Sequence, residues 1–225
     1  MNLAGELRAG TEALGIRLQQ TQYDQLLEYL YLLEKWSQTY NLTAIKGLPK
    51  MMCYHLLDSL SIMPYLTNCN KAIDVGSGAG LPGIPLAIAM PETIWVMLDS
   101  NSRKTRFIRQ AIAHCGLHNA QVVQTRVQDY HAPDSPDFIV SRAYASLTDF
   151  CDSVAHLMAP GTRLLTMKTG LKPEEAGQLD QSRFAFEEEV LQVPGIGEPR
   201  SLVAITQLRT GAVPSLMTQP NDPVQ

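Results

Sequence analysis

The chain has 225 residues, enough for one good-sized domain or for a domain with a helical extension. Hydrophobic residues make up 45% of it, as in an ordinary globular protein, and 18 basic against 22 acidic residues leave a net charge of −4. This balance argues against indiscriminate nucleic-acid binding and leaves room for a local basic patch.

The cysteines and histidines show no metal-ligand spacing. The four cysteines form no Cys-x-x-Cys pair, and the five histidines are scattered along the chain. We therefore expect structural, reduced thiols, no bound metal and a cytoplasmic location. No segment approaches the roughly 20 apolar residues that a membrane-spanning helix needs, so no membrane association is expected.

Residues 1–66 are predicted to form an N-terminal helical extension. Apolar residues recur at helical spacing from Gln20 to Tyr40, and the cap and turn residues 41–44 end that helix. A second helix is predicted over residues 49–65. His55 and Asp58 lie three positions apart on its surface, and the pattern favours capping and packing roles within this segment.

Strands and helices alternate from residue 70 onward. Strands are predicted at residues 71–75, 93–98, 120–124, 137–141, 161–167, 184–193 and 201–208. Helices are predicted at residues 82–90, 102–115, 146–158 and 172–181. This alternation indicates an α/β domain with a parallel sheet covered on both faces, and the last two strands suit an antiparallel edge. We assign residues 67–209 to this domain and predict a disordered, proline-containing tail over residues 210–225.

A glycine-rich turn over residues 74–83 follows the first strand and leads into a helix. Such a turn lets backbone approach a nucleotide-like ligand closely. The glycines stand at positions 76, 78 and 80, and Leu81 occupies the position where a dinucleotide fingerprint needs its third glycine. The spacing Asp-x-Gly-x-Gly-x-Gly resembles motif I of class I S-adenosylmethionine (SAM) methyltransferases, a Rossmann-like fold.

A second acid supports a nucleotide site. Asp99 ends the next strand, about 20 residues after the glycines, where an acid accepts hydrogen bonds from ribose hydroxyls. A glycine cluster alone also occurs in tight turns of unrelated α/β proteins, and Asp99 makes that explanation weaker. The motif predicts a cofactor site that includes Asp74, Gly76, Gly78, Gly80 and Asp99.

Over residues 20–208 the chain resembles the bacterial small-subunit ribosomal RNA methyltransferase family once called glucose-inhibited division protein B. The matching stretches, in order, are Asn41-Leu42-Thr43-Ala44, residues 55–60, residues 74–85, Leu98-Asp99-Ser100, Arg126-Val127, Ser141-Arg142-Ala143 and Met167-Lys168. Members methylate N7 of a guanine in 16S ribosomal RNA. The resemblance implies a seven-stranded class I fold, SAM as cofactor, and 16S rRNA or the small ribosomal subunit as partner of a monomer.

The resemblance also implies roles for single residues. SAM would be held by Gly76, Leu81, Val127, Gln128 and Arg142, and Lys168 and Arg200 would contact RNA. The chain departs from the family where Lys168 is followed by Thr169-Gly170 rather than by glycine. It also departs where serine follows Arg200, in place of the usual histidine.

Guanine N7 carries a lone pair and no proton, so its methylation needs in-line placement rather than a general base. The absence of a catalytic His/Asp pair is therefore expected. Arg142 follows an apolar strand at the carboxyl edge of the sheet, where ligands bind, and its forked donors suit the SAM carboxylate or RNA. We therefore predict that Arg142 positions the reactants. Tyr144 is expected in the core.

A basic cluster follows Asp99 on the next predicted helix: Arg103, Lys104, Arg106 and Arg109. The cluster can be an ordinary solvated face or a patch that contacts phosphates beside the active site. Its density on an acidic protein favours RNA binding.

Three other functions stay open at this point. A SAM enzyme acting on another RNA, a small molecule or a protein would carry the same turn. A dinucleotide-dependent oxidoreductase is disfavoured by Leu81. A non-enzymatic nucleotide-binding regulator is the remaining alternative.

Overall fold

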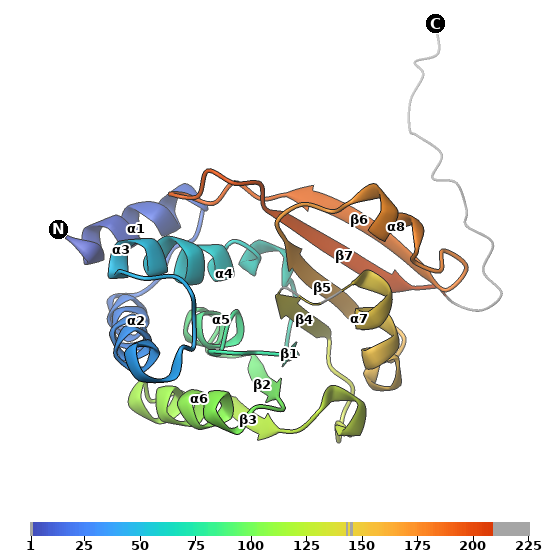
Figure 1. Cartoon of the computed structure of the whole chain (residues 1–225), viewed down its shortest axis with the longest axis horizontal. Helices are drawn as coiled ribbons and strands as arrows, with labels where there is room; N and C mark the ends of the chain where they lie inside the picture. Colours follow the sequence, from blue (N-terminus) through green and yellow to red (C-terminus); the bar gives the residue numbers. More distant parts are fainter. Residues whose placement is uncertain (1, 143, 145, 209–225) are drawn as a thin grey trace, which may run out of the picture.

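The computed structural model describes residues 2–142, 144 and 146–208, and the predicted tail over residues 210–225 lies outside this range. Seven strands form one sheet in the order β3-β2-β1-β4-β5-β7-β6 (Figure 1). Their bounds are Lys71–Val75 (β1), Ile94–Asp99 (β2), Ala120–Gln124 (β3), Phe138–Arg142 (β4), Arg163–Lys168 (β5), Phe184–Val190 (β6) and Ser201–Gln207 (β7). β1 to β5 are parallel, and β7 and β6 form the predicted antiparallel edge.

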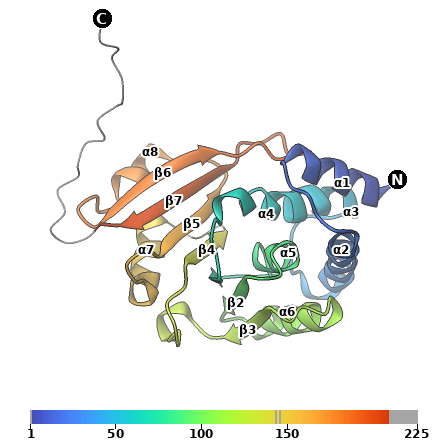
Figure 2. The same ribbon diagram turned by 180° about the vertical axis from the view of Figure 1, so that it is seen from behind.

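Helices cover both faces of the sheet (Figures 1 and 2). On one face lie α1 (Leu3–Ala13), α2 (Gln20–Tyr40), α3 (Leu48–Met51), the π-helix η1 (Met52–Leu57), α4 (Asp58–Leu60), α5 (Gly83–Ala89) and α6 (Ser102–His114). α7 (Leu147–Val154) packs on the other face, with the short 3-10 helices η3 (Val127–Asp129) and η4 (Ala155–Leu157). Neighbouring strand residues point to opposite faces, so Ala72 joins the first core and Ile73 the second.

The N-terminal helices are docked on the sheet domain and share its core. Tyr29 of α2 is fully buried and donates its hydroxyl to the carbonyl of Ala79 in the glycine-rich turn, at 2.7 Å. Gln22 donates to the carbonyls of Ile88 and Ala89 at the end of α5. Helix α2 therefore supports the turn from behind.

The segment after α2 differs from its prediction. The helix expected over residues 49–65 is divided into α3, η1, α4 and the 3-10 helix η2 (Met63–Tyr65). Within η1 the carbonyl of Tyr54 accepts a hydrogen bond from Arg142 Nη1 at 3.1 Å. A contact with a residue so distant in the chain leaves no mark in the local periodicity.

The helix expected over residues 172–181 is also shorter. α8 (Pro173–Gly177) ends at a glycine, and Asp180 then accepts hydrogen bonds from the amide and hydroxyl of Ser182. These side-chain bonds form a turn into β6, which a continued helix would not allow.

Two absences concern the described part of the chain. None of its helices is both long and apolar enough to cross a membrane. No group of three histidine, cysteine or acidic side chains there could hold a metal ion.

Helix α5 begins against the sheet at Gly83, which yields the first prediction. A Cβ atom there would lie 2.7 Å from Asp74 Oδ2 and 2.9 Å from Met97 Cγ, both in buried surroundings. Gly83→Ala should therefore lower the free energy of unfolding by about 1–3 kcal/mol, as measured by urea denaturation. Gly177→Ala is the matched control, because a Cβ there meets nothing within 4 Å. An equal free energy of unfolding in the Gly83→Ala and Gly177→Ala variants would contradict the close packing of Gly83 against β1 and β2.

Candidate active site

The ends of β2, β1 and β4 form the centre of the site. Val75, the last residue of β1, pairs with Leu98 of β2 on one side and with Ser141 of β4 on the other. The residues that follow these three are Asp99, Gly76 and Arg142. Because neighbouring strands lie about 4.8 Å apart, the three residues form a row along the carboxyl edge. Ligands of open α/β sheets bind outside this edge.

The glycine turn is attached to the end of β2. The amides of Gly76 and Ser77 donate to the carbonyl of Leu98, at 2.8 and 3.0 Å. The amide of Gly78 donates to Asp99 Oδ2 at 2.9 Å, and Asn101 donates its amide to Oδ1 at 2.8 Å. Each carboxylate oxygen keeps a lone pair, so Asp99 is oriented and can still accept from hydroxyl groups.

Other motif residues support the turn from beneath. Asp74 is completely buried, and its Oδ2 accepts the amide of Gly83 at 2.9 Å. Burial raises the pKa of Asp74 to about 7, so its charged form is disfavoured there. Gly80 faces Ile84 so closely that a Cβ would come within 2.6 Å of it. Leu81 is also buried, whereas Gly76 is exposed and Gly78 is half-buried.

Val127 and Gln128 belong to η3, the 3-10 turn that follows β3 beside β2. The Val127 side chain is buried in the core under α7, and Gln128 is exposed. Of this pair, Gln128 alone presents an accessible side chain.

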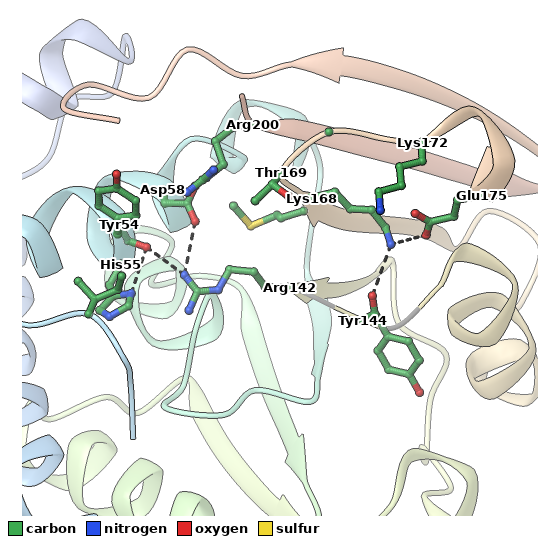
Figure 3. Close-up of a pocket in the computed structure, with 13 residues that line it drawn as sticks. Tyr54, His55, Asp58, Arg142, Tyr144, Lys168, Thr169, Lys172, Glu175 and Arg200 are labelled. Atoms are coloured by element: carbon green, nitrogen blue, oxygen red, sulfur yellow. Dashed lines mark hydrogen bonds and ion pairs between the residues drawn. The ribbon is translucent and has the colours of Figure 1, made fainter. Parts of the chain in front are cut away.

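Arg142 also lines a cavity of about 510 Å³ on the β4–β5–β7 side of the row (Figure 3). The register continues the row there: Arg142 pairs with Met167, and the next residue, Lys168, pairs with Ser201, which Arg200 precedes. The cavity is lined by Ile45, Tyr54, His55, Asp58, Arg142, Tyr144, Met167, Lys168, Thr169, Gly170, Lys172, Glu175 and Arg200. Three of the predicted site residues, Arg142, Lys168 and Arg200, are thus brought together.

Two ion-pair groups occupy this cavity. Asp58 lies between Arg142, with Nη1–Oδ2 at 3.4 Å, and Arg200, with Nε–Oδ1 at 3.2 Å. Lys168 pairs with Glu175 and approaches the carbonyl of Tyr144 at 3.4 Å (Figure 3). Packing within the N-terminal segment is therefore the wrong description of Asp58. Tyr144 borders the cavity, while its ring packs against the core beside Phe150, as predicted.

His55 does fit the predicted packing role. Burial and the nearby Arg142 guanidinium lower the pKa of His55 to about 4, so the ring is neutral at pH 7. A carbonyl can only accept, so Nδ1 donates to the Tyr54 carbonyl at 3.0 Å, and Nε2 accepts from the Thr43 hydroxyl at 2.9 Å. Both ring nitrogens are engaged, and His55 offers no free base.

The cysteines offer no ready nucleophile either. Cys115 and Cys151 are buried, and burial raises the pKa of each thiol to about 12. Both thiols are therefore protonated at neutral pH.

The basic cluster of α6 lies apart from the cavity. Arg103, Arg106 and Arg109 are exposed, and none of them lines it. Lys104 instead turns toward Asp99, with Nζ–Oδ2 at 3.9 Å. α6 starts three residues after β2 ends, so Arg103 lies beside the carboxyl edge and Arg109 about 9 Å further along the helix.

Comparison with known proteins identifies the family. A family model described as rRNA small subunit methyltransferase G matches residues 22–203. The chain belongs to this family. A Nitrosococcus oceani protein named ribosomal RNA small subunit methyltransferase G is 47% identical over 94% of this chain and 99% of its own length. A Chromobacterium violaceum protein of the same name is 44% identical over 88% of this chain and 95% of its own.

The fold comparison agrees with this membership. Magnesium protoporphyrin IX methyltransferase from Synechocystis, solved with bound SAM, aligns with 79% of this chain and 96% of its own at a TM-score of 0.55 and 12% identity. The chain therefore has the predicted class I SAM methyltransferase fold. As a family member it is a SAM-dependent methyltransferase, which removes the oxidoreductase and the non-enzymatic regulator.

Sequence reasoning missed several cavity residues of this family member, among them Tyr54, Lys172 and Glu175. Tyr54 acts through its backbone carbonyl, which no residue pattern reveals. Lys172 comes just before the short helix α8 and Glu175 lies in it, so both follow β5 closely in the chain, but no motif singled them out. The His55 to Leu60 stretch was the one available signal for Asp58.

The turn yields the second prediction. Gly78 has φ of +59°, and its Cβ position is open apart from the Gly76 carbonyl at 3.8 Å. Gly78→Ala should weaken SAM binding in calorimetric titration by about tenfold or more, because the methyl group enters the space a ligand would fill. Gly15→Ala is the control, with φ of +72° and nothing within 4 Å at a remote turn. Equal SAM affinity of the two variants would remove Gly78 from the cofactor site.

Proposed function

We propose that the protein transfers the methyl group of SAM to N7 of a guanine in 16S ribosomal RNA. The family and the names of the two relatives support an RNA substrate from the small ribosomal subunit. We propose further that it acts as a cytoplasmic monomer, with residues 1–66 as a helical extension of the methyltransferase domain over residues 67–209. The cavity beside Arg142 is the observation that carries the proposal.

The cofactor belongs at the row of strand ends in this proposal. Gly76 and Gly78 would approach SAM through backbone, and Asp99 would accept from the ribose hydroxyls. Gln128 would reach the adenine side, and Arg142 would meet the carboxylate or the RNA. Asp74, Gly80 and Leu81 would act indirectly, because all three are buried beneath the turn. SAM supplies an activated methyl group when bound.

The target base belongs in the cavity. Its volume of about 510 Å³ is in the range of small-molecule pockets, and it opens beside Arg142, next to the proposed cofactor row. A base would have to leave its stack to enter, as with other enzymes that act on bases. Four cations and two carboxylates line the cavity, so its formal charge is +2, which suits a nucleotide with its phosphate.

Methyl transfer to guanine N7 requires mainly that the two reactants are held in the correct position. The N7 lone pair attacks the methyl carbon, the carbon–sulfur bond breaks, and the positive charge moves from sulfur to the guanine ring. No proton is transferred, which agrees with the fully engaged His55 and the protonated buried thiols. The rate then depends on holding the reactants in line, a contribution that reaches several kcal/mol.

The third prediction tests base and position together. N7-methylguanine is cationic, so reduction followed by aniline should cleave RNA from wild-type cells at one guanine of 16S rRNA. RNA from a strain lacking the gene should stay intact there, and primer extension locates the difference. The same cleavage in both strains would refute the substrate. A mark on adenine, cytosine, a protein or a small molecule would leave SAM transfer standing and refute the N7 mechanism.

The fourth prediction concerns α6. If Arg103 and Arg106 contact phosphates, replacing both by glutamine should reduce the slope of log affinity against log salt by about 0.7–0.9 per contact. Filter binding of 16S rRNA at several salt concentrations measures this slope. The control is Lys71→Gln with Arg163→Gln, which removes equal charge at the starts of β1 and β5, the opposite edge of the sheet. Identical slopes in both double variants would make the α6 cluster a solvated face.

A further inference from the structure

Asp58 connects the N-terminal helices to two arginines of the sheet domain. Its side chain is 6% exposed, and its two oxygens meet Arg142 from β4 and Arg200, which directly precedes β7. One carboxylate thus serves two guanidinium groups that are separated by 58 residues in sequence and lie at the ends of β4 and β7, the strands on either side of β5. Figure 3 shows both arginine side chains turned toward it.

The π-helix supplies a second acceptor at the same place. The amide of Asp58 donates to the carbonyls of Cys53 and His55, and the Tyr54 carbonyl between them accepts from Arg142 Nη1 at 3.1 Å. π-helical turns are rare, and they occur frequently at functional sites. Here one backbone carbonyl of the π-helix accepts from a β4 side chain as well as from His55 Nδ1.

A count of donors shows what remains for a ligand. Arginine has five N–H donors, and Arg142 directs its two Nη1 hydrogens to Tyr54 and Asp58. Within the described residues, no hydrogen bond engages its Nε and Nη2 groups. These groups form one edge of the guanidinium, with the fork geometry that binds an oxyanion in two places. Arg200 uses Nε for Asp58 and Nη1 for the Pro199 carbonyl, which leaves Nη2.

Because Asp58 is buried, its charge and the positions of the two arginines depend on one another. Desolvation raises the pKa of Asp58, and the two arginines oppose that shift. Removing one partner of a buried ion pair leaves the other uncompensated. The arginines would then be free to take other rotamers, and the open edge of Arg142 would lose its direction.

We propose that Asp58 is a positioning residue, which holds Arg142 and Arg200 so that their free donors face an oxyanion in the cavity. The oxyanion is either the SAM carboxylate or an RNA phosphate, and the proposal rests on the proposed methylation of 16S rRNA. Asp58 does not touch the reacting atoms; it acts through the two arginines.

The test compares Asp58→Asn with a matched control. The amide side chain would keep the shape but lose the charge, and a lost charged hydrogen bond should lower kcat/KM for small ribosomal subunits from a gene-deletion strain by about 10- to 100-fold. Asp152→Asn removes an equivalent carboxylate from Arg183, a half-exposed pair with Nη1–Oδ1 at 3.1 Å outside the cavity, and should leave kcat/KM unchanged.

Calorimetric SAM binding separates the two oxyanions: weaker SAM binding indicates the carboxylate, and a raised RNA KM alone indicates the phosphate.

A double-mutant cycle tests whether Asp58 acts through Arg200. The loss caused by Asp58→Asn should be smaller in an Arg200→Met background, and the fully additive loss of two independent sites would overturn the proposal. Wild-type kcat/KM in folded Asp58→Asn protein would also overturn it. If Asp58→Asn does not fold, Arg142→Lys replaces it: lysine keeps the charge without the fork, so wild-type activity there would refute the oriented edge. If the wild-type protein shows no activity on small ribosomal subunits, the proposed function is refuted. The SAM affinity of the Asp58→Asn variant, compared with that of the wild type, then tests the role of Asp58.

Discussion

The register of β1 is the constraint on which the site depends. Val75 pairs with Leu98 and Ser141, so the residues that follow these three, Gly76, Asp99 and Arg142, form one row at the carboxyl edge. A slip of one residue along β4 would move Ser141, whose hydroxyl donates to the Val75 carbonyl at 2.9 Å, away from its partner. Arg142 would then no longer stand beside Gly76. The packed cores on both faces of the sheet hold this register in place.

The N-terminal helices contribute directly to the carboxyl edge of the sheet. They share one hydrophobic core with the sheet, and Tyr29 bonds the glycine turn directly. Through Asp58 and the Tyr54 carbonyl they also reach Arg142 at the end of β4. A change in the packing of α2 would therefore affect the glycine turn through the hydrogen bond of Tyr29. A change in the packing of η1 would affect the cavity through the contacts of Asp58 and the Tyr54 carbonyl with Arg142.

The distribution of polar groups matches a reaction that moves charge and no proton. Both ring nitrogens of His55 are engaged in hydrogen bonds, and the buried thiols of Cys115 and Cys151 are protonated. In the cavity proposed for the nucleotide, Asp58 pairs with Arg200 and Glu175 pairs with Lys168. The protein as a whole is acidic, with a net charge of −4, so the proposed attraction for RNA depends on local groups of cations such as those of the cavity and of α6.

The sequence by itself determined the sheet, the glycine turn and Asp99, because period-2 and period-3.6 patterns and glycine spacing are local signals. It also placed Arg142 at the end of β4 and brought out the family resemblance that the comparisons confirmed. Only the tertiary structure decided that Asp74 and Gly80 lie beneath the turn, and that the α6 cations stand apart from Lys168 and Arg200. It likewise decided the contacts of Asp58, because two arginines meet it from segments that no local pattern connects.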